Sequence, residues 1–139
     1  MLSYSPMSGN YPNTFYRVAV KALIKNDKGQ VLLVKENSDK WDLPGGGLDH
    51  DEEPEDGIKR ELEEEIGVSS GVTVGKIVKQ KSFWIDDKKA WLMWIVYEVK
   101  LADQTDFHPG EGVTDIAFID PRSFGTSEDD RERYLTIFM

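Results

Sequence analysis

Residues 46–68 decide the fold of this 139-residue chain, and they read GGLDHDEEPEDGIKRELEEEIGV. Local signals place one helix in this stretch, from Pro54 to Ile66. Proline suits the first turn of a helix, where its missing N–H has no intrahelical partner, and acidic residues crowd that turn at the positive end of the helix dipole. Gly67 suits the left-handed conformation that ends many helices. The stretch therefore predicts a loop, a helix and a second loop.

The predicted helix has an apolar stripe and an acidic flank. The stripe can dock on a sheet, and it consists of Ile58, Leu62 and Ile66. Glu61, Glu64 and Glu65 share one flank, because residues three and four apart are neighbours on a helix surface. From charge alone this flank is a solvated surface, yet Glu61 and Glu65 repel each other without a lysine between them. Mg²⁺ would remove the repulsion, since it binds oxygen ligands and usually works with a few carboxylates and substrate phosphates.

Two other helix residues point to the same flank. Gly57 lies beside it, and a glycine inside a helix costs about 1 kcal/mol relative to alanine. Close approach of a metal or ligand would explain that glycine. Arg60 can pair with Asp56 and Glu64, one turn before and one turn after it. Such pairs would stiffen the flank and hold a carboxylate in position.

The defined positions of this stretch resemble the signature box of the Nudix hydrolases in residue type and spacing. They are Gly46, Glu52 after five residues, Arg60-Glu61-Leu62 after seven more, then Glu64-Glu65 and Gly67-Val68, each after one residue. The preceding 43–46, Leu-Pro-Gly-Gly, is similar to the loop that usually leads into that box. The resemblance implies an α+β fold of the Nudix type, an α/β/α sandwich with a mixed sheet and a loop-helix-loop catalytic motif.

The resemblance also implies a hydrolase that cleaves a pyrophosphate bond with Mg²⁺, or alternatively Mn²⁺. The implied metal ligands are Glu61, Glu64 and Glu65, joined by the backbone carbonyl of Gly45. The general base stays open between Glu61 and an acid from a downstream loop, for which Glu111 is the first candidate and Asp115 the second; an exposed charge beside a turn is the other interpretation of Glu111.

Four more residues are expected to support the reaction. Arg60 would position Glu61, and Glu52 would orient the loop or a water next to the metal ligands. Gly46 would allow the backbone to approach a phosphate closely, and Gly67 would end the helix.

Charge is unevenly distributed along the chain. The net charge is −9, and residues 49–65 hold ten acids against one lysine and one arginine, so the remainder is close to neutral. A small phosphorylated nucleotide that arrives with magnesium is a reasonable partner. Polymeric nucleic acid is not expected, because no basic stripe is present to neutralise a phosphate backbone. No apolar run approaches the length of a membrane span.

Other catalytic systems fit poorly. The chain has no cysteine, which rules out disulfides, a thiol nucleophile and a thiolate zinc site, and is compatible with a cytoplasmic location. Neither His50 nor His108 stands in a zinc-ligand spacing, and both are interpreted as exposed loop residues. Nucleophile-elbow, P-loop and dinucleotide-binding motifs are missing from the sequence.

The rest of the chain predicts one domain over 14–139, after a flexible lead-in at 1–13 without a secretory signal. Strands are expected at 15–24 and 30–35, joined by a turn at 26–29 as a hairpin, with Arg17, Lys21 and Lys25 on the polar face of the first. A short strand is expected at 41–43, followed by strands at 72–84, 90–99 and 116–119 and an acidic helix from about residue 127. The strand at 90–99 is apolar on both faces and should be central.

The substrate is the least determined feature. Aromatic side chains could stack a base, although most, including Trp91 and Trp94, are expected in the core. The sequence lacks the additional motifs, after the box, that resemblance to Nudix hydrolases of ADP-ribose, NADH or dinucleoside polyphosphates would imply. The favoured substrate is a nucleoside triphosphate, including an oxidised one, giving nucleoside monophosphate and pyrophosphate. The alternatives are ADP-ribose, a nucleotide sugar, a dinucleoside polyphosphate, or a non-catalytic nucleotide sensor. A homodimer, common in the family, is neither supported nor excluded.

Overall fold

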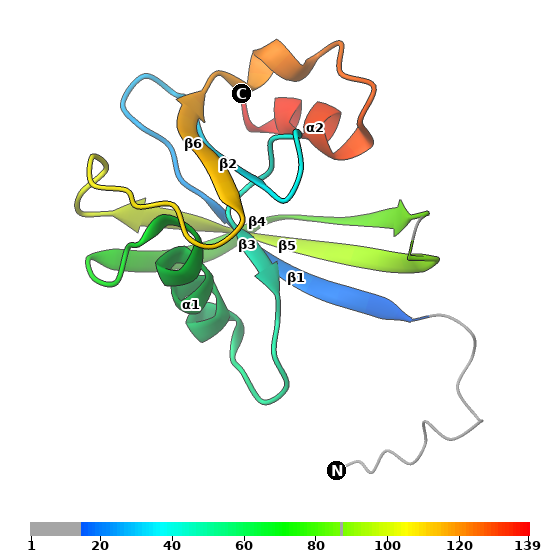
Figure 1. The fold of residues 1–139 in the computed structure, drawn as a ribbon, viewed down its shortest axis with the longest axis horizontal. Coiled ribbons are helices and arrows are strands. Elements are labelled where there is room, and N and C mark those ends of the chain that lie inside the picture. Colours follow the sequence, from blue (N-terminus) through cyan, green and yellow to red (C-terminus); the bar gives the residue numbers. More distant parts are fainter. Residues whose placement is uncertain (1–14, 87) are drawn as a thin grey trace.

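The computed structural model describes residues 15–86 and 88–139, and Figure 1 shows their arrangement. The elements in chain order are β1 (Tyr16–Leu23), β2 (Val31–Glu36), β3 (Gly45–Gly47), α1 (Pro54–Ile66), β4 (Val72–Ile85), β5 (Ala90–Leu101), β6 (Val113–Ile119), the 3-10 turn η2 (Pro121–Phe124), α2 (Asp130–Tyr134) and the 3-10 turn η3 (Leu135–Phe138). The predicted lead-in at 1–13 lies outside the described residues.

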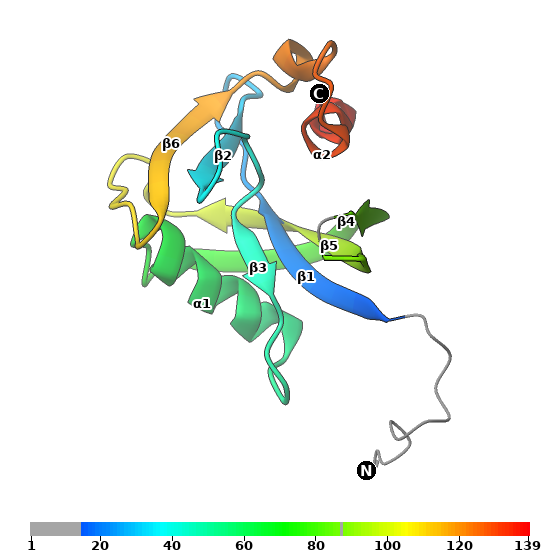
Figure 2. The ribbon, with the colours of Figure 1, turned by 45° about the vertical axis from the view of Figure 1, so that its right-hand side comes forward.

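Four strands form a mixed sheet in the order β3-β1-β5-β4, in which β1 and β5 run parallel and the other neighbours antiparallel. Strand β5 therefore lies between two others, as its two apolar faces predicted. Strands β2 and β6 form a separate antiparallel pair. The sheet lies between α1 on one side and the C-terminal segment that contains α2 on the other (Figure 2). The α+β class and the mixed sheet predicted from the sequence are confirmed.

The core has two clusters, one on each face of the mixed sheet. Side chains that alternate along β1 enter different clusters: Ala19 and Leu23 pack towards the C-terminal segment, and Val20 and Ala22 pack against the stripe of α1. All three stripe residues of α1 are at most 1% exposed. The stripe thus fixes the rotation of α1 about its axis, and with it the direction of the acidic flank.

The predicted hairpin of the first two strands is wrong. The turn at 26–29 forms, with the N–H of Gly29 bonded to the carbonyl of Asn26 at 3.1 Å, but the pairing ends after one bridge between Lys25 and Val31. Strand β2 then leaves to pair with β6. Its neighbouring residues Leu32 and Leu33 are both fully buried and belong to different clusters. A strand apolar on both faces gains more between two clusters than at the edge of one sheet.

The short strand expected at 41–43 is also misplaced. Only Asp42 is bridged there, to Val34, and the strand that pairs with β1 is the glycine segment β3. Gly45 has a φ of +136°, and a Cβ at this position would lie 2.1 Å from the carbonyl oxygen of Val20. Only glycine permits this close approach, so the glycine segment is a strand pressed against β1.

The C-terminal helix is shorter than expected. It begins after Asp129, whose carboxylate accepts the N–H groups of Arg131 and Glu132, and it gives way to η3 after five residues. Asp129 is an ordinary N-cap. None of the helices in the described part of the chain is long and apolar enough to cross a membrane.

Candidate active site

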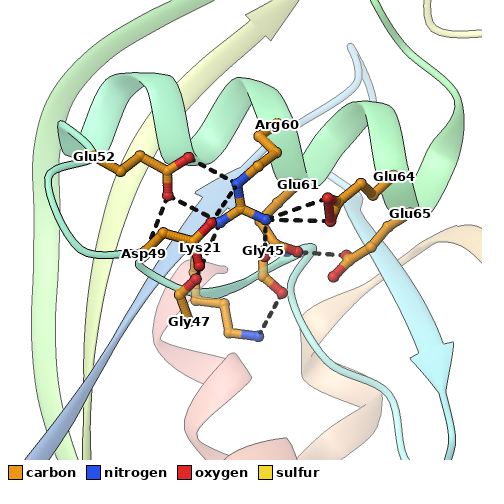
Figure 3. Close-up of polar contacts among 9 residues, drawn as sticks. All are labelled: Lys21, Gly45, Gly47, Asp49, Glu52, Arg60, Glu61, Glu64 and Glu65. Carbon is orange, nitrogen blue, oxygen red and sulfur yellow. Dashed lines mark hydrogen bonds and ion pairs between the residues drawn. The ribbon is translucent and has the colours of Figure 1, made fainter.

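Helix α1 carries the acidic flank, and its ends are those predicted. It starts at Pro54 and ends at Ile66, followed by Gly67 in the left-handed conformation with a φ of 74°. The N–H of Gly67 is bonded to the carbonyl of Glu63, which satisfies one of the free carbonyls at the helix end. With the stripe buried, the flank of α1 faces the glycine strand β3 (Figure 3).

Glu61 lies directly beneath the glycine strand. Its side chain is 11% exposed, and a Cβ on Gly46 would lie 2.7–2.9 Å from its carboxylate atoms. The hydrogen of the glycine therefore leaves the space that this carboxylate occupies. Nη1 of Arg60 pairs with the same carboxylate at 3.0 Å.

Glu65 is the most buried acid of the flank, at 3% exposure. Its Oε1 accepts the N–H of Gly45 at 3.0 Å. Burial raises the pKa of Glu65 to about 9, against the opposing effects of the Gly45 N–H and the Lys21 ammonium, and the nearby carboxyl of Glu36 raises it further. Burial also raises the pKa of Glu36. Without a metal ion, this pair of carboxyl groups therefore keeps a proton near neutral pH.

Glu64 points the other way. Its side chain is 57% exposed and pairs with Arg60 at 3.2 Å. Across residues 15–86 and 88–139, no three acids or histidines are already arranged around one point as metal ligands. Glu61 and Glu65 converge on β3, whereas Glu64 is held on the outer side of the guanidinium group (Figure 3). Arg60 is thus the cation that bridges Glu61 and Glu64 in this structure.

The guanidinium of Arg60 links α1 to the loop that precedes it. Two of its nitrogens form a fork with Glu52, at 2.7 and 2.9 Å, and Nη2 also donates to the carbonyl of Gly47 at 3.1 Å. The hydrogen bond from Arg60 lowers the pKa of Glu52 to about 2, so Glu52 stays ionised. Glu52 in turn accepts the N–H of Asp49 at 3.0 Å. The partner expected one turn before, Asp56, is replaced by Glu52, because the loop folds back over the helix.

Gly57 was explained from the sequence by the approach of a metal or ligand, and the structure shows a packing role for it. A Cβ there would lie 2.8 Å from Cδ1 of Leu48 and 3.2 Å from Oε1 of Glu52. The glycine therefore makes room for the folded-back loop, which accounts for it without a metal or ligand.

Two residues near the flank were not predicted as part of the site. Lys21 was expected on the polar face of its strand, yet it is 6% exposed and its ammonium lies beneath the loop before β3. Glu36 ends β2 and interacts with Glu65. Sequence alternation signals neither, because both depend on contacts between distant segments.

The downstream loop that carries Glu111 packs on the C-terminal end of α1. The N–H of Gly110 donates to the carbonyl of Glu65 at 3.0 Å, and the N–H of His108 donates to the carbonyl of Ile66 at 2.9 Å. Glu111 follows directly and is exposed. Asp115, the second candidate base, is exposed in β6 opposite Lys35. The structure thus brings the Glu111 loop to the helix end that carries Glu64 and Glu65.

The residues of the flank fit a hard divalent cation. The available donors are carboxylate and backbone oxygens, which suit Mg²⁺ or Mn²⁺. Two of the carboxyl groups, Glu61 and Glu65, are buried, and burial holds Glu65 protonated. A bound divalent ion would replace that proton and favour both carboxylates.

A cavity of about 760 Å³ lies between the end of the β4–β5 hairpin and α2, and its lining includes no residue of the acidic flank. Its lining combines aromatic side chains such as Phe83 and Tyr134 with charged side chains of both signs: Lys81, Arg131, Arg133, Asp86, Glu128, Asp129 and Asp130. Phe83 and Tyr134 meet edge to face, with ring centroids 5.5 Å apart. Trp94 is buried as expected, but Trp91 is 37% exposed, contrary to its expected core position. The cavity has the size and character of a ligand pocket.

Comparisons with known proteins are consistent with this geometry. Residues 15–137 match the NUDIX domain family. The chain is 53% identical over 55 residues to an RNA pyrophosphohydrolase of Ruthia magnifica, and the match covers 39% of this chain and 31% of that relative. It is 46% identical over 54 residues to an RNA pyrophosphohydrolase of Pseudomonas putida, and this match covers 38% of this chain and 34% of that relative. The chain thus spans about a third of the length of these curated relatives.

Two solved structures share the fold along nearly the whole chain. The MutT protein of Methanosarcina mazei superimposes with a TM-score of 0.74 at 26% identity, covering 92% of this chain and 94% of that one. The MutT NUDIX hydrolase of Burkholderia pseudomallei gives 0.71 at 21% identity, with 90% and 98% covered.

Proposed function

Because the chain belongs to the NUDIX family, we propose that it hydrolyses a pyrophosphate bond with the help of Mg²⁺ or Mn²⁺. The resemblance first seen in residues 46–68 is thereby confirmed as family membership. The observation that carries the activity is the pair of buried carboxylates, Glu61 and Glu65, held against a glycine strand. A protein that only binds a nucleotide has no need of these acids, and burying them costs free energy that their removal would save.

The reaction requires neutralised phosphate oxygens, an activated water and a stabilised leaving group. Glu61, Glu64 and Glu65, with the carbonyl of Gly45, would hold the divalent ion, which supplies charge neutralisation and a more acidic water. Glu61 receives its orientation from Arg60, and Arg60 is itself held by the fork with Glu52. The base that takes the proton of the attacking water is Glu61, Glu111 or Asp115.

The substrate we favour is a nucleoside triphosphate. The cavity between the β4–β5 hairpin and α2 offers aromatic rings for a base, and its cations Lys81, Arg131 and Arg133 lie among four acids of the same lining. Phe83 contributes a ring at the inner wall, where it is 7% exposed. The products would be a nucleoside monophosphate and pyrophosphate.

A triphosphorylated RNA 5′ end is the second candidate substrate. Relatives named RNA pyrophosphohydrolase match this chain over about a third of their length. In addition, three aromatic residues form one row across adjacent strands, because Tyr16 is paired with Trp91 and Trp91 with Trp84. They are 49%, 37% and 46% exposed, and exposed rings on a sheet can stack unpaired bases. The net charge of −9 opposes this candidate.

Product release from a substrate panel tests the proposal. The panel contains nucleoside triphosphates, oxidised nucleotides, ADP-ribose, nucleotide sugars, dinucleoside polyphosphates and a 5′-triphosphate oligoribonucleotide, each with and without Mg²⁺. The Glu64→Gln variant should lose at least about 100-fold in turnover and keep its fold. Glu63→Gln is the matched control, because Glu63 is an exposed acid of the same helix outside the acidic flank. Magnesium binding by a folded protein that turns over no member of the panel would favour the nucleotide sensor.

A further inference from the structure

Lys21 has an unusual position in the middle of β1. Its ammonium nitrogen lies 3.2 Å from Oδ2 of Asp42, 3.2 Å from the carbonyl oxygen of Leu43 and 3.4 Å from that of Gly45. An ammonium group has three donors, and these three acceptors are all in the segment that leads into β3. Lys21 itself is 6% exposed.

Packing alone does not explain a lysine here. The residues two positions before and after it on the same face, Ala19 and Leu23, belong to the apolar core, and the ammonium lies 5.3 Å from the ring centroid of Trp94, which is fully buried. An apolar side chain would suit these neighbours, and burying an ammonium group requires removing its water. The interactions with the loop, together with the ring face of Trp94, compensate for that loss.

The acceptors of Lys21 connect it to the acidic flank. The carbonyl of Gly45 faces Lys21, while the N–H of the same residue donates to Glu65 at 3.0 Å. The N–H of Ala22, the next residue of β1, also donates to the carbonyl of Pro44 at 2.9 Å. Residues 42–44 are therefore attached to β1 by one backbone bond and by the lysine, whereas Gly45 begins the β3 strand that pairs with β1. Gly45 links this segment to Glu65.

We propose that Lys21 is a positioning residue that fixes residues 42–45 and thereby sets the place of Gly45 against Glu65. The proposal rests on the hydrolase function proposed above, since Gly45 and Glu65 are its expected metal ligands. The three acceptors of the Lys21 ammonium group are all protein atoms of residues 42–45. This ammonium group is used to hold backbone carbonyls in one direction, which an apolar side chain of equal length cannot do.

The absence of cysteine from the chain permits a test by chemical rescue. The Lys21→Cys variant is alkylated in denaturant and refolded. Reaction with 2-bromoethylamine restores a side chain of lysine length with an ammonium group, and reaction with 1-iodopropane gives a neutral side chain of nearly the same length. The two proteins then differ at residue 21 in charge and hydrogen bonding, with packing nearly matched.

Amide hydrogen exchange reports the position of the loop without any need for activity. We expect the amides of Gly45, Gly46 and Gly47 to exchange at least about tenfold faster in the neutral derivative, while those in the middle of α1 keep their protection. The ammonium derivative should show the protection of the unaltered chain. With an active substrate in hand, kcat should fall by about ten- to 100-fold in the neutral derivative, with KM changed by less than about threefold.

Three results would overturn the proposal. Equal loop protection in the two derivatives would show that the charge holds nothing. A parallel loss of protection in the loop and α1 would make Lys21 a residue of general stability. If the neutral derivative does not fold, Lys21→Met is measured in the same way. If neither neutral form folds while the ammonium derivative does, the role of Lys21 is in folding and not in positioning the loop. Because exchange is measured without substrate, an inactive chain with the expected exchange pattern would refute the hydrolase and leave the positioning role intact.

Discussion

Replacing Glu65 by glutamine should stabilise the metal-free protein at alkaline pH while it removes a predicted metal ligand. The carboxyl is 3% exposed, and burial raises its pKa to about 9. A glutamine keeps the oxygen that accepts the N–H of Gly45, has nearly the same volume and cannot ionise. The variant therefore isolates the consequence of burying a titratable group at this position.

The size and sign of the effect follow from linkage. A carboxyl group in an unfolded chain has a pKa near 4.5, so the folded state binds more protons than the unfolded state between about pH 4.5 and 9. Stability from the retained proton is complete below the unfolded pKa and is lost as the pH rises through the folded value, at up to about 1.4 kcal/mol per pH unit. The ceiling between pH 5.5 and 8.5 is about 4 kcal/mol, and because the Gly45 N–H and the Lys21 ammonium favour the ionised form, we expect a loss of at least about 2 kcal/mol.

Urea unfolding in EDTA at pH 5.5, 7.0 and 8.5 measures this loss. At pH 8.5 Glu65→Gln should be at least about 2 kcal/mol more stable than the unaltered chain, with little difference at pH 5.5. Saturating Mg²⁺ should reverse the order, because an ion bound only by the folded chain adds about 2.7 kcal/mol at 100 times its Kd. Glu64→Gln, at a 57% exposed side chain, should leave the pH dependence unchanged. A metal-free chain whose stability stays level over this pH range would refute the reasoning.

Four further outcomes are expected. Gly46→Ala should lower turnover at least about 100-fold in a folded protein, since the new Cβ would lie 2.7 Å from an oxygen of Glu61; steady-state kinetics and circular dichroism check this. Arg60→Lys should lower activity about 10- to 100-fold, because lysine cannot form the fork with Glu52. Lys59→Gln is the control in the same kinetic assay, and equal activity of the two variants would contradict the prediction. Glu132→Ala should destabilise the chain by about 2–3 kcal/mol in urea unfolding, because this buried carboxylate accepts a backbone N–H from the segment before β3 at 2.7 Å. Chelation by EDTA should stop turnover and leave the far-UV spectrum unchanged; simultaneous unfolding would show a structural metal instead.

The features that sequence predicted well are those that local chemistry determines. The bounds of α1 follow from a proline at its first position and a left-handed glycine after its last, and both act within one turn. The burial of the apolar stripe and the central position of β5 follow from periodicity. None of these predictions required knowledge of which distant segments meet.

The features that sequence missed depend on such meetings. Strand β2 carries the same apolar pattern whether it forms a hairpin with β1 or pairs with β6, so periodicity could not choose between them. Lys21 alternates with apolar residues as on a solvated face, yet it lies on the core side near Trp94 and is covered by the loop that folds over β1. Likewise, the partner of Arg60 is Glu52 because residues 48–52 turn back over α1, into the space that Gly57 leaves.

Two cations flank the acidic side of α1. Arg60 lies on the outer side of the flank and bridges Glu61 and Glu64, while Lys21 lies on the inner side, beneath the loop. Between them, Glu65 avoids charge by keeping a proton, since burial raises its pKa to about 9. The protein thus compensates the outer acids with a guanidinium group and the innermost acid by protonation. A divalent ion would compete with Arg60 for Glu64 and with the proton for Glu65, so its affinity should rise with pH, as that of a site whose ligands must be deprotonated does.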